Sequence, residues 1–265
     1  MSTLNLSLIQ TSTTWHDPAA NRAHLEALCK QLPEQGDLVV LPEMFSTGFT
    51  MDSRAQAEPM AGPTVDWLRT MAQRYQRTFC GSAVICENDR YYNRLLWVSA
   101  DGDVATYDKR HRFRMAGEHE HYDAGRERLV VSLKGWRVCP LICYDLRFPV
   151  WSRNTGDDFD LLLYVANWPA PRHAAWQTLL AARAIENQVY VAAVNVIGSD
   201  GNGERYAGGS GVWGFDGARL AHCGAVQAVT SVEIARQPLL DFRASFPAWQ
   251  DGDAFTLNED NPASL

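Results

Sequence analysis

Short apolar runs bounded by turn residues recur along the chain and predict a series of strands. The first run alternates apolar and polar positions over residues 4–9, whereas residues 38–41 are wholly apolar, as expected of a central strand. Runs at 78–86 and 91–99, separated by a polar turn, predict a hairpin. The other predicted strands occupy residues 104–107, 129–133, 136–143, 161–165 and 189–196, followed by a strand–turn–strand unit that continues to about residue 234.

Apolar residues at helical spacing separate several of these runs. Asp17-Pro18 marks a helix start, because proline is tolerated at the first helical position, and Pro63 marks another. A third helix is predicted over residues 173–187 and a short one over 148–154. Strands and helices that alternate in this way, with hairpins among them, predict one layered α/β domain with a mixed sheet.

Three segments fall outside this pattern. Residues 110–128 form a long irregular stretch, and such stretches inside a compact domain are usually functional. Residues 198–211 are rich in glycine but lack the spacing of a phosphate-binding loop, so we expect an ordinary loop. From about residue 235 the chain is expected to form a tail that packs on a partner subunit.

Composition narrows the class of protein. Of 265 residues, 46% are hydrophobic and 21% are charged, with a formal net charge of -7 and no basic block, so neither nucleic acid nor an anionic membrane is an expected partner. The chain shows no signal-peptide pattern at its start and no apolar run long enough to span a membrane. Six scattered cysteines suit a reduced, cytoplasmic setting better than a disulfide framework.

Three predicted strands each end in a side chain that can take part in chemistry. Glu43 follows the strand at 38–41, Lys109 follows the strand at 104–107, and Cys143 ends the strand at 136–143. Ligands in open α/β sheets gather beyond the carboxyl ends of strands, and a thiol becomes a strong nucleophile when a neighbour takes its proton. A single charged residue at such a place is usually solvated, but three complementary groups together predict an active site.

The segments around these residues resemble the signature regions of the nitrilase superfamily of carbon–nitrogen hydrolases, and most closely its omega-amidase branch. The similar segments read LPEMF at Glu43, YDKRH at Lys109, CYDLRFP at Cys143 and RAIENQVYV from Arg183. The resemblance implies a four-layer α-β-β-α sandwich that forms a homodimer or higher homo-oligomer. It also implies an amidase that needs no cofactor.

The resemblance assigns a role to each residue. Cys143 would be the nucleophile, Glu43 the general base, and Lys109 would stabilise the oxyanion together with the backbone N–H of Tyr144. A nucleophile must attack an unreactive amide with the help of such groups, a base and donors to the oxyanion. A second glutamate, expected seven residues before Gly125, would be Glu118, with Glu120 as the alternative if the loop alignment shifts by two residues.

The same branch implies a short α-keto acid amide as substrate, such as 2-oxoglutaramate or 2-oxosuccinamate. Its carboxylate requires a cation, for which Arg114 and Arg147 are the candidates, and Tyr122 and Trp168 are candidate walls. Arg147 has a competing structural interpretation, in which it pairs with Asp145 and braces the turn after Cys143.

Other hypotheses remain open. The enzyme could be a different amidase, a nitrilase or an N-carbamoyl amidohydrolase, and a non-catalytic member of the fold is a further alternative. His119 and His121 could converge with His111 on a metal if the loop were strand-like, although no established metal-ligand spacing accompanies them. His111 could also serve Cys143 as its base.

Overall fold

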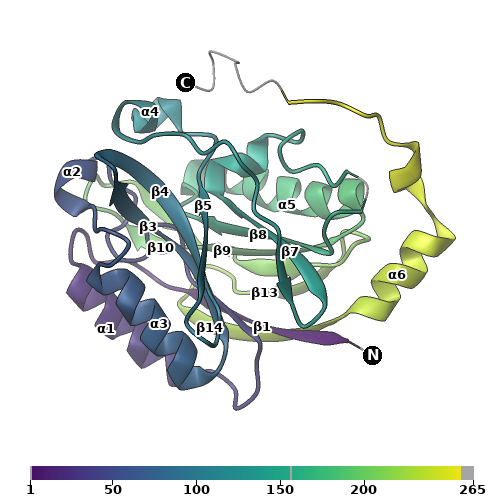
Figure 1. Cartoon of the computed structure of the whole chain (residues 1–265), viewed down its shortest axis with the longest axis horizontal. Helices are drawn as coiled ribbons and strands as arrows, with labels where there is room; N and C mark the ends of the chain where they lie inside the picture. Colours follow the sequence, from purple (N-terminus) through teal and green to yellow (C-terminus); the bar gives the residue numbers. More distant parts are fainter. Residues whose placement is uncertain (1, 156, 258–265) are drawn as a thin grey trace.

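The computed structural model describes residues 2–155 and 157–257, in which two six-stranded sheets lie face to face. Helices α1 (Pro18–Cys29) and α3 (Pro63–Tyr75) pack on the outer side of one sheet, and α5 (His173–Asn187) packs on the other sheet (Figure 1). The layers therefore have the order α-β-β-α, and the prediction of a four-layer sandwich is confirmed.

The first sheet has the order β14-β1-β2-β3-β4-β5. Its strands β1 to β3 are parallel to one another, and the other neighbours are antiparallel. The strands are β1 (Thr3–Gln10), β2 (Leu38–Val40), β3 (Thr78–Glu87), β4 (Arg90–Val98), β5 (Val104–Asp108) and β14 (Ala228–Ala235). The predicted hairpin is β3–β4, whose turn residues Asn88 and Asp89 both take positive φ angles.

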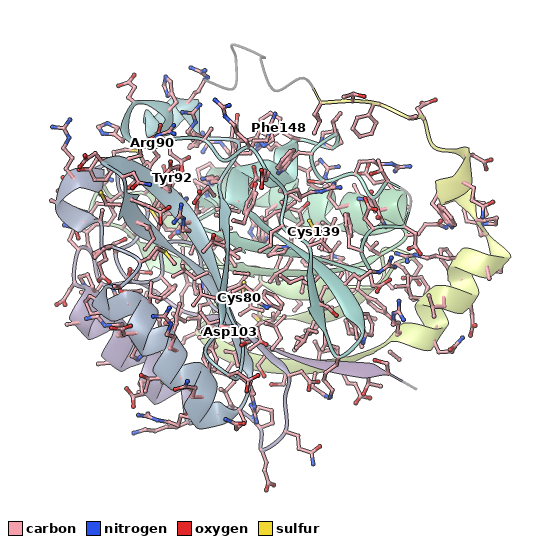
Figure 2. All side chains as sticks on the ribbon, in the orientation of Figure 1. Cys80, Arg90, Tyr92, Asp103, Cys139 and Phe148 are labelled. Carbon is pink, nitrogen blue, oxygen red and sulfur yellow. The ribbon has the colours of Figure 1, made fainter. Side chains whose placement is uncertain are left out.

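The second sheet has the order β13-β12-β9-β8-β7-β6, with β7, β8 and β9 parallel. The strands are β6 (Val131–Leu133), β7 (Trp136–Ile142), β8 (Leu161–Ala166), β9 (Tyr190–Asn195), β12 (Gly211–Trp213) and β13 (Arg219–His222). Residues of both sheets share one apolar core, which includes Cys80 on β3 and Cys139 on β7 (Figure 2). This common core fixes the position of one sheet against the other.

The helix starts agree with the signals in the sequence. The Asp17 side chain accepts a hydrogen bond from the Ala20 N–H at 2.9 Å, and Pro18 is the first residue of α1. Pro63 likewise begins α3, and Gln76, directly after the last helical residue, caps the helix in the left-handed conformation. Local sequence therefore determines where these two helices begin.

Two local predictions are wrong. The helix expected over 148–154 is absent, and a 3₁₀ helix, η2 (Cys143–Arg147), precedes that segment instead. Pro149 explains the difference, because it disfavours helical angles at Phe148, which is extended. The glycine-rich loop contains a small antiparallel hairpin of β10 (Ile197–Ser199) and β11 (Arg205–Ala207), which belongs to neither large sheet.

The irregular stretch at 110–128 contains two short helical turns, η1 (Arg114–Ala116) and α4 (Glu118–His121). The remaining short elements are α2 (Ser53–Gln56), η3 (Ala170–Arg172) and η4 (Ala248–Asp251). None of the helices in the described part of the chain has the length and apolar character needed to cross a bilayer.

The segment expected to form a tail begins with α6 (Arg236–Ser245), which packs on its own chain. Leu239 is fully buried in the common core, and the Arg243 guanidinium lies 3.2 Å from Asp160. The prediction that the tail packs on a partner subunit therefore remains only for the residues after α6. Of these, residues 258–265 lie outside the described part of the chain.

Candidate active site

The structure brings the three strand-end side chains to one place. Glu43 lies in the loop after β2, Lys109 follows β5 directly, and Cys143 follows β7 directly. The first two come from one sheet and the third from the other, so the site lies where the two sheets meet. Lys109 Nζ donates to Glu43 Oε1 at 2.8 Å, and both Lys109 and Cys143 line the same cavity.

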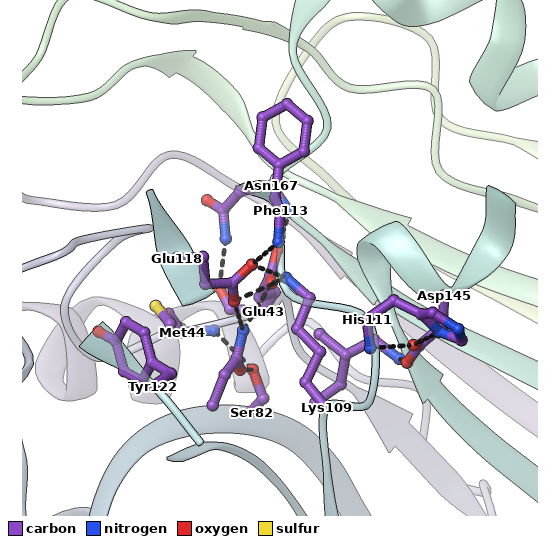
Figure 3. A network of polar contacts seen from close by, with 12 residues as sticks. Glu43, Met44, Ser82, Lys109, His111, Phe113, Glu118, Tyr122, Asp145 and Asn167 are labelled. Carbon is purple, nitrogen blue, oxygen red and sulfur yellow. Dashed lines mark hydrogen bonds and ion pairs between the residues drawn. The ribbon is translucent and has the colours of Figure 1, made fainter. Parts of the chain in front are cut away.

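A second carboxylate completes the surroundings of Lys109 (Figure 3). Glu118, on α4, is fully buried and accepts from Lys109 Nζ through both oxygens at 2.9 Å. Its Oε2 also accepts the Phe113 backbone N–H at 2.5 Å. The Glu120 side chain is 70% exposed, so the register that places Glu118 rather than Glu120 in the site agrees with the structure.

The Glu43 carboxylate is held on both of its oxygens. Oε1 accepts from Lys109 and from Asn93 Nδ2 at 2.7 Å, and Oε2 accepts the backbone N–H of Asn167 at 2.7 Å. The Asn167 side chain also donates to the Glu43 backbone carbonyl at 2.6 Å. Asn167 follows β8 directly, so a fourth strand end contributes to the site.

Cys143 occupies a strained backbone position. Its φ is +42°, which costs a non-glycine residue on the order of 1–3 kcal/mol. Asp145, fully buried, stabilises the turn by accepting the Ile142 N–H at 3.0 Å and the Tyr107 hydroxyl at 2.7 Å. The strained turn presents the thiol to the cavity at the start of η2, where backbone N–H groups have no partner within the helix.

The expected pairing of Asp145 with Arg147 is wrong. The Asp145 Oδ1 atom accepts from His111, through the backbone N–H at 3.1 Å and through Nδ1 at 2.8 Å. The His111 ring stacks on Phe148 at 3.7 Å between centroids. His111 thus braces Asp145 instead of facing Cys143, and the hypothesis that His111 is the base loses its geometric support.

A cavity of about 340 Å³ opens beside Cys143. Three of the residues predicted to bind substrate, Tyr144, Arg147 and Trp168, line it, and the Arg147 guanidinium lies over the Trp168 ring at 4.8 Å. The other lining residues are Phe49, Met51, Lys109, Phe113, Met115, Ala116, Asn167, Pro169, Arg172, Asp200, Asn202, Glu204 and Tyr206.

Two expected substrate contacts do not line this cavity. Tyr122 packs with Met44 and Val84, and its hydroxyl donates to the Thr50 carbonyl at 2.6 Å. Arg114 is an exposed residue of η1. The second guanidinium that lines the cavity belongs to Arg172, which was not predicted from the sequence, and not to Arg114.

The protonation of the buried groups is set by their surroundings. Burial raises the pKa of the Cys143 thiol well above its ordinary value, and the negative charge of the neighbouring Glu43 adds to the rise. Burial alone lowers the pKa of Lys109, but Glu118 and Glu43 outweigh this effect and raise it overall. Burial also raises the pKa of Glu118, against the influence of Lys109. At neutral pH the site therefore holds a neutral thiol beside a charged ammonium.

The histidines of this segment do not form a metal site. His119 and His121 lie on the helical turn α4, where side chains two residues apart diverge, so the assumption of a strand was wrong. Both line a separate, polar cavity of about 600 Å³. Within residues 2–155 and 157–257, no group of three or more His, Cys, Asp or Glu side chains could hold a metal ion.

Several residues of the site were not predicted from the sequence. Asn167 could have been found by applying the strand-end rule to the strand at 161–165. Asn93 lies within β4, and Arg172 lies in the turn before α5, so neither position carries a local signal. Asp200, Glu204 and Tyr206 belong to the hairpin that was expected to be an ordinary loop.

Comparisons with known proteins agree with this geometry. The family model described as carbon-nitrogen hydrolase matches residues 5–243. The omega-amidase YafV of Yersinia enterocolitica is 49% identical over 97% of this chain and 100% of its own length. The 2-oxoglutaramate amidase of Bacillus subtilis (strain 168) is 32% identical over 93% of this chain and 96% of its own.

A solved structure shows the same fold. XC1258 from Xanthomonas campestris, described as a CN-hydrolase superfamily protein with an arsenic adduct in the active site, is 50% identical and superposes with a TM-score of 0.95. The match covers 97% of this chain and 100% of that one. The resemblance found in four short segments therefore extends over nearly the whole chain.

Proposed function

The chain belongs to the carbon–nitrogen hydrolase family and is an amide-hydrolysing enzyme, and from this premise we propose that it is an omega-amidase for short α-keto acid amides. It would convert a substrate such as 2-oxoglutaramate into the keto acid and ammonia. The names of the two curated relatives, omega-amidase and 2-oxoglutaramate amidase, support this substrate class.

One observation in the site carries the proposal. Arg147 stacks on Trp168 and has no hydrogen-bond or ion-pair partner in the described part of the chain, although it lines the cavity that contains Cys143. A guanidinium without a carboxylate partner can bind a planar anion through two hydrogen bonds. An amide with a carboxylate at its other end would place the anion on Arg147 and the amide carbon at Cys143.

In the first half of the proposed reaction, the Cys143 sulfur attacks the amide carbon. Glu43 accepts the thiol proton as the carbon–sulfur bond forms, then delivers it to the departing nitrogen, and ammonia leaves as the carbon–nitrogen bond breaks. The raised pKa of Cys143 supports this role for Glu43, because a thiol that stays neutral at rest requires a base during the attack.

In the second half, a water molecule attacks the thioester carbon. Glu43 accepts a proton from that water, and the sulfur leaves as the carbon–sulfur bond breaks and regains its proton from Glu43. The cycle restores the thiol and the carboxylate and releases the keto acid. Glu43 thus acts in both halves of the reaction. Hydrogen bonds from Asn93 and Asn167 hold its two oxygens in place, which supports this dual role.

Lys109 and the Tyr144 N–H would stabilise the oxyanion in both halves. Lys109 has three N–H groups, and in the structure they face Glu43 Oε1 and both oxygens of Glu118. Turning one N–H from Glu118 to the oxyanion leaves each carboxylate with one bond to the ammonium. Loss of one oxyanion donor commonly costs about 100- to 1,000-fold in rate.

We also propose that the enzyme acts in the cytoplasm as a homodimer or a higher homo-oligomer. All six cysteines are free, which suits a reduced compartment. Ile185 on α5 is 54% exposed and Phe246, directly after α6, is 60% exposed, and such apolar side chains are suited to a subunit interface. The chain after α6 would pack there.

The test of the substrate class measures ammonia release from a panel of compounds. The panel contains 2-oxoglutaramate, 2-oxosuccinamate, uncharged amides of the same length, aliphatic nitriles and N-carbamoyl amino acids. We expect kcat/KM to be highest for the two keto acid amides. Clear turnover of nitriles or carbamoyl compounds, with none of the keto acid amides, would replace this substrate class by one of those alternatives.

A further inference from the structure

Asn93 occupies the position between the two carboxylates of the site. It lies on β4 and is 1% exposed. Its Nδ2 atom donates to Glu43 Oε1 at 2.7 Å and to Glu118 Oε1 at 3.3 Å. Those two oxygens are also the ones that accept from Lys109, so Asn93 and Lys109 share both acceptors.

The orientation of this amide is determined by its other neighbours. Ser82 Oγ accepts the Met44 backbone N–H at 2.9 Å and therefore donates its single proton to Asn93 Oδ1 at 2.8 Å. The Asn93 oxygen faces Ser82, and both amide hydrogens face the carboxylates. Met44 itself has a φ of +43°, so this chain of hydrogen bonds also fixes the backbone next to Glu43.

The charge of the site explains why a neutral donor suits this position. Two carboxylates surround one ammonium, so the buried cluster carries one excess negative charge when all three groups are ionised. A cation in place of Asn93 would neutralise the general base, and a carboxylate would add a third negative charge. An amide stabilises the ionised carboxylates without changing the total charge.

We propose that Asn93 is a positioning residue that keeps the Glu43 carboxylate aligned and that holds Lys109 between Glu43 and Glu118. This inference rests on the proposed roles of Glu43 as base and Lys109 as oxyanion donor. The Asn93 Nδ2 atom contacts both carboxylates and Asn93 does not line the cavity with Cys143, so it acts through the carboxylates rather than on the substrate.

Two substitutions separate positioning from general support of the fold. N93A removes the donor and the link to Ser82. N93D keeps the shape but introduces a carboxyl group that can donate only while it is protonated. A matched control is N154A, because Asn154 is also buried and bonded to backbone through both ends of its amide, yet lies outside the active-site cavity.

The readout is the pH profile of kcat and KM for 2-oxoglutaramate, with folding checked by circular dichroism. For N93A we expect kcat to fall about 10- to 100-fold, KM to change less than threefold, and the acidic limb of kcat/KM to move to higher pH, since the ionised carboxylates lose a donor. For N93D we expect an additional loss of activity as pH rises and the introduced carboxyl ionises. N154A should keep the wild-type profile.

The proposal fails if folded N93A and N93D keep kcat within threefold of wild type, or if their losses are equal at every pH. Failure of the proposed function would look different, because wild-type enzyme would then not hydrolyse the keto acid amide, or an E43Q variant would keep its activity. The two claims are therefore tested separately in one set of assays.

Discussion

Replacing Arg147 by methionine should separate charged from uncharged substrates. The guanidinium lies over Trp168 at 4.8 Å and has no anionic partner in the described part of the chain. Methionine keeps much of the apolar stem that covers the ring but removes the charge and the hydrogen-bond donors. R147M should fold normally, since a partly exposed cation–π contact contributes only about 0.5–1 kcal/mol.

The size of the effect depends on the interaction that would be lost. A hydrogen bond to a charged group contributes about 1.5–3 kcal/mol. At about 1.36 kcal/mol for each factor of ten, kcat/KM for 2-oxoglutaramate should fall roughly 10- to 150-fold. Most of the fall should appear in KM if the contact is equally strong in the ground state and the transition state.

The assay compares 2-oxoglutaramate with pentanamide, an uncharged amide of the same carbon chain length. R147M should leave kcat/KM for pentanamide within about threefold of wild type, because no carboxylate is present to lose its partner. R172M is the parallel variant, since Arg172 also lines the cavity but contacts the Met115 sulfur at 2.9 Å. An equal fall for both substrates in R147M would refute the assignment of Arg147 to the carboxylate.

Two further predictions concern the whole chain. The pKa of Cys143 is raised in the folded state, against about 8.5 when unfolded, so above that pH only the unfolded thiol ionises and the free energy of unfolding falls. In urea titrations from pH 8 to 10, wild type should lose about 2 kcal/mol more in total than C143A, as the slope approaches about 1.36 kcal/mol per pH unit. Identical losses in the two proteins would contradict the burial argument. Because the described residues form no metal-ligand cluster, we expect kcat to be unchanged after dialysis against a chelator, whereas loss of activity restored by added zinc would favour the metal-dependent alternative.

The sequence predicted the large elements because their signals are local. The wholly apolar run before Glu43 predicts a strand and the pair Asp17-Pro18 predicts a helix start. The structure contains both elements, as β2 and α1. The rule that chemistry gathers at strand ends placed Glu43, Lys109 and Cys143 together without any knowledge of which strands are neighbours. Their meeting depends on two sheets facing each other, which the family resemblance, rather than periodicity, supplied.

The remaining parts of the site depend on contacts that local sequence does not encode. Arg114 lies in η1 and Arg172 in η3, and only the path of the chain decides that Arg172 lines the cavity. Asp145 and Arg147 stand two residues apart, but Asp145 bonds Tyr107 and His111, which precede it by more than thirty residues. Asp145 therefore bonds to residues distant in the sequence and not to its neighbour Arg147. The contacts of Asn93 with Glu43 and Glu118 are also long-range, so the sequence did not identify this residue.

The central claim is that amide hydrolysis passes through a thioester on Cys143, and rapid-quench mass spectrometry tests it most directly. Wild-type enzyme mixed with saturating 2-oxoglutaramate, quenched in acid within milliseconds and digested, should carry the acyl group of the keto acid on the peptide that contains Cys143. C143A should show neither the adduct nor turnover. An acyl group on a different residue, or full turnover by C143A, would contradict the account.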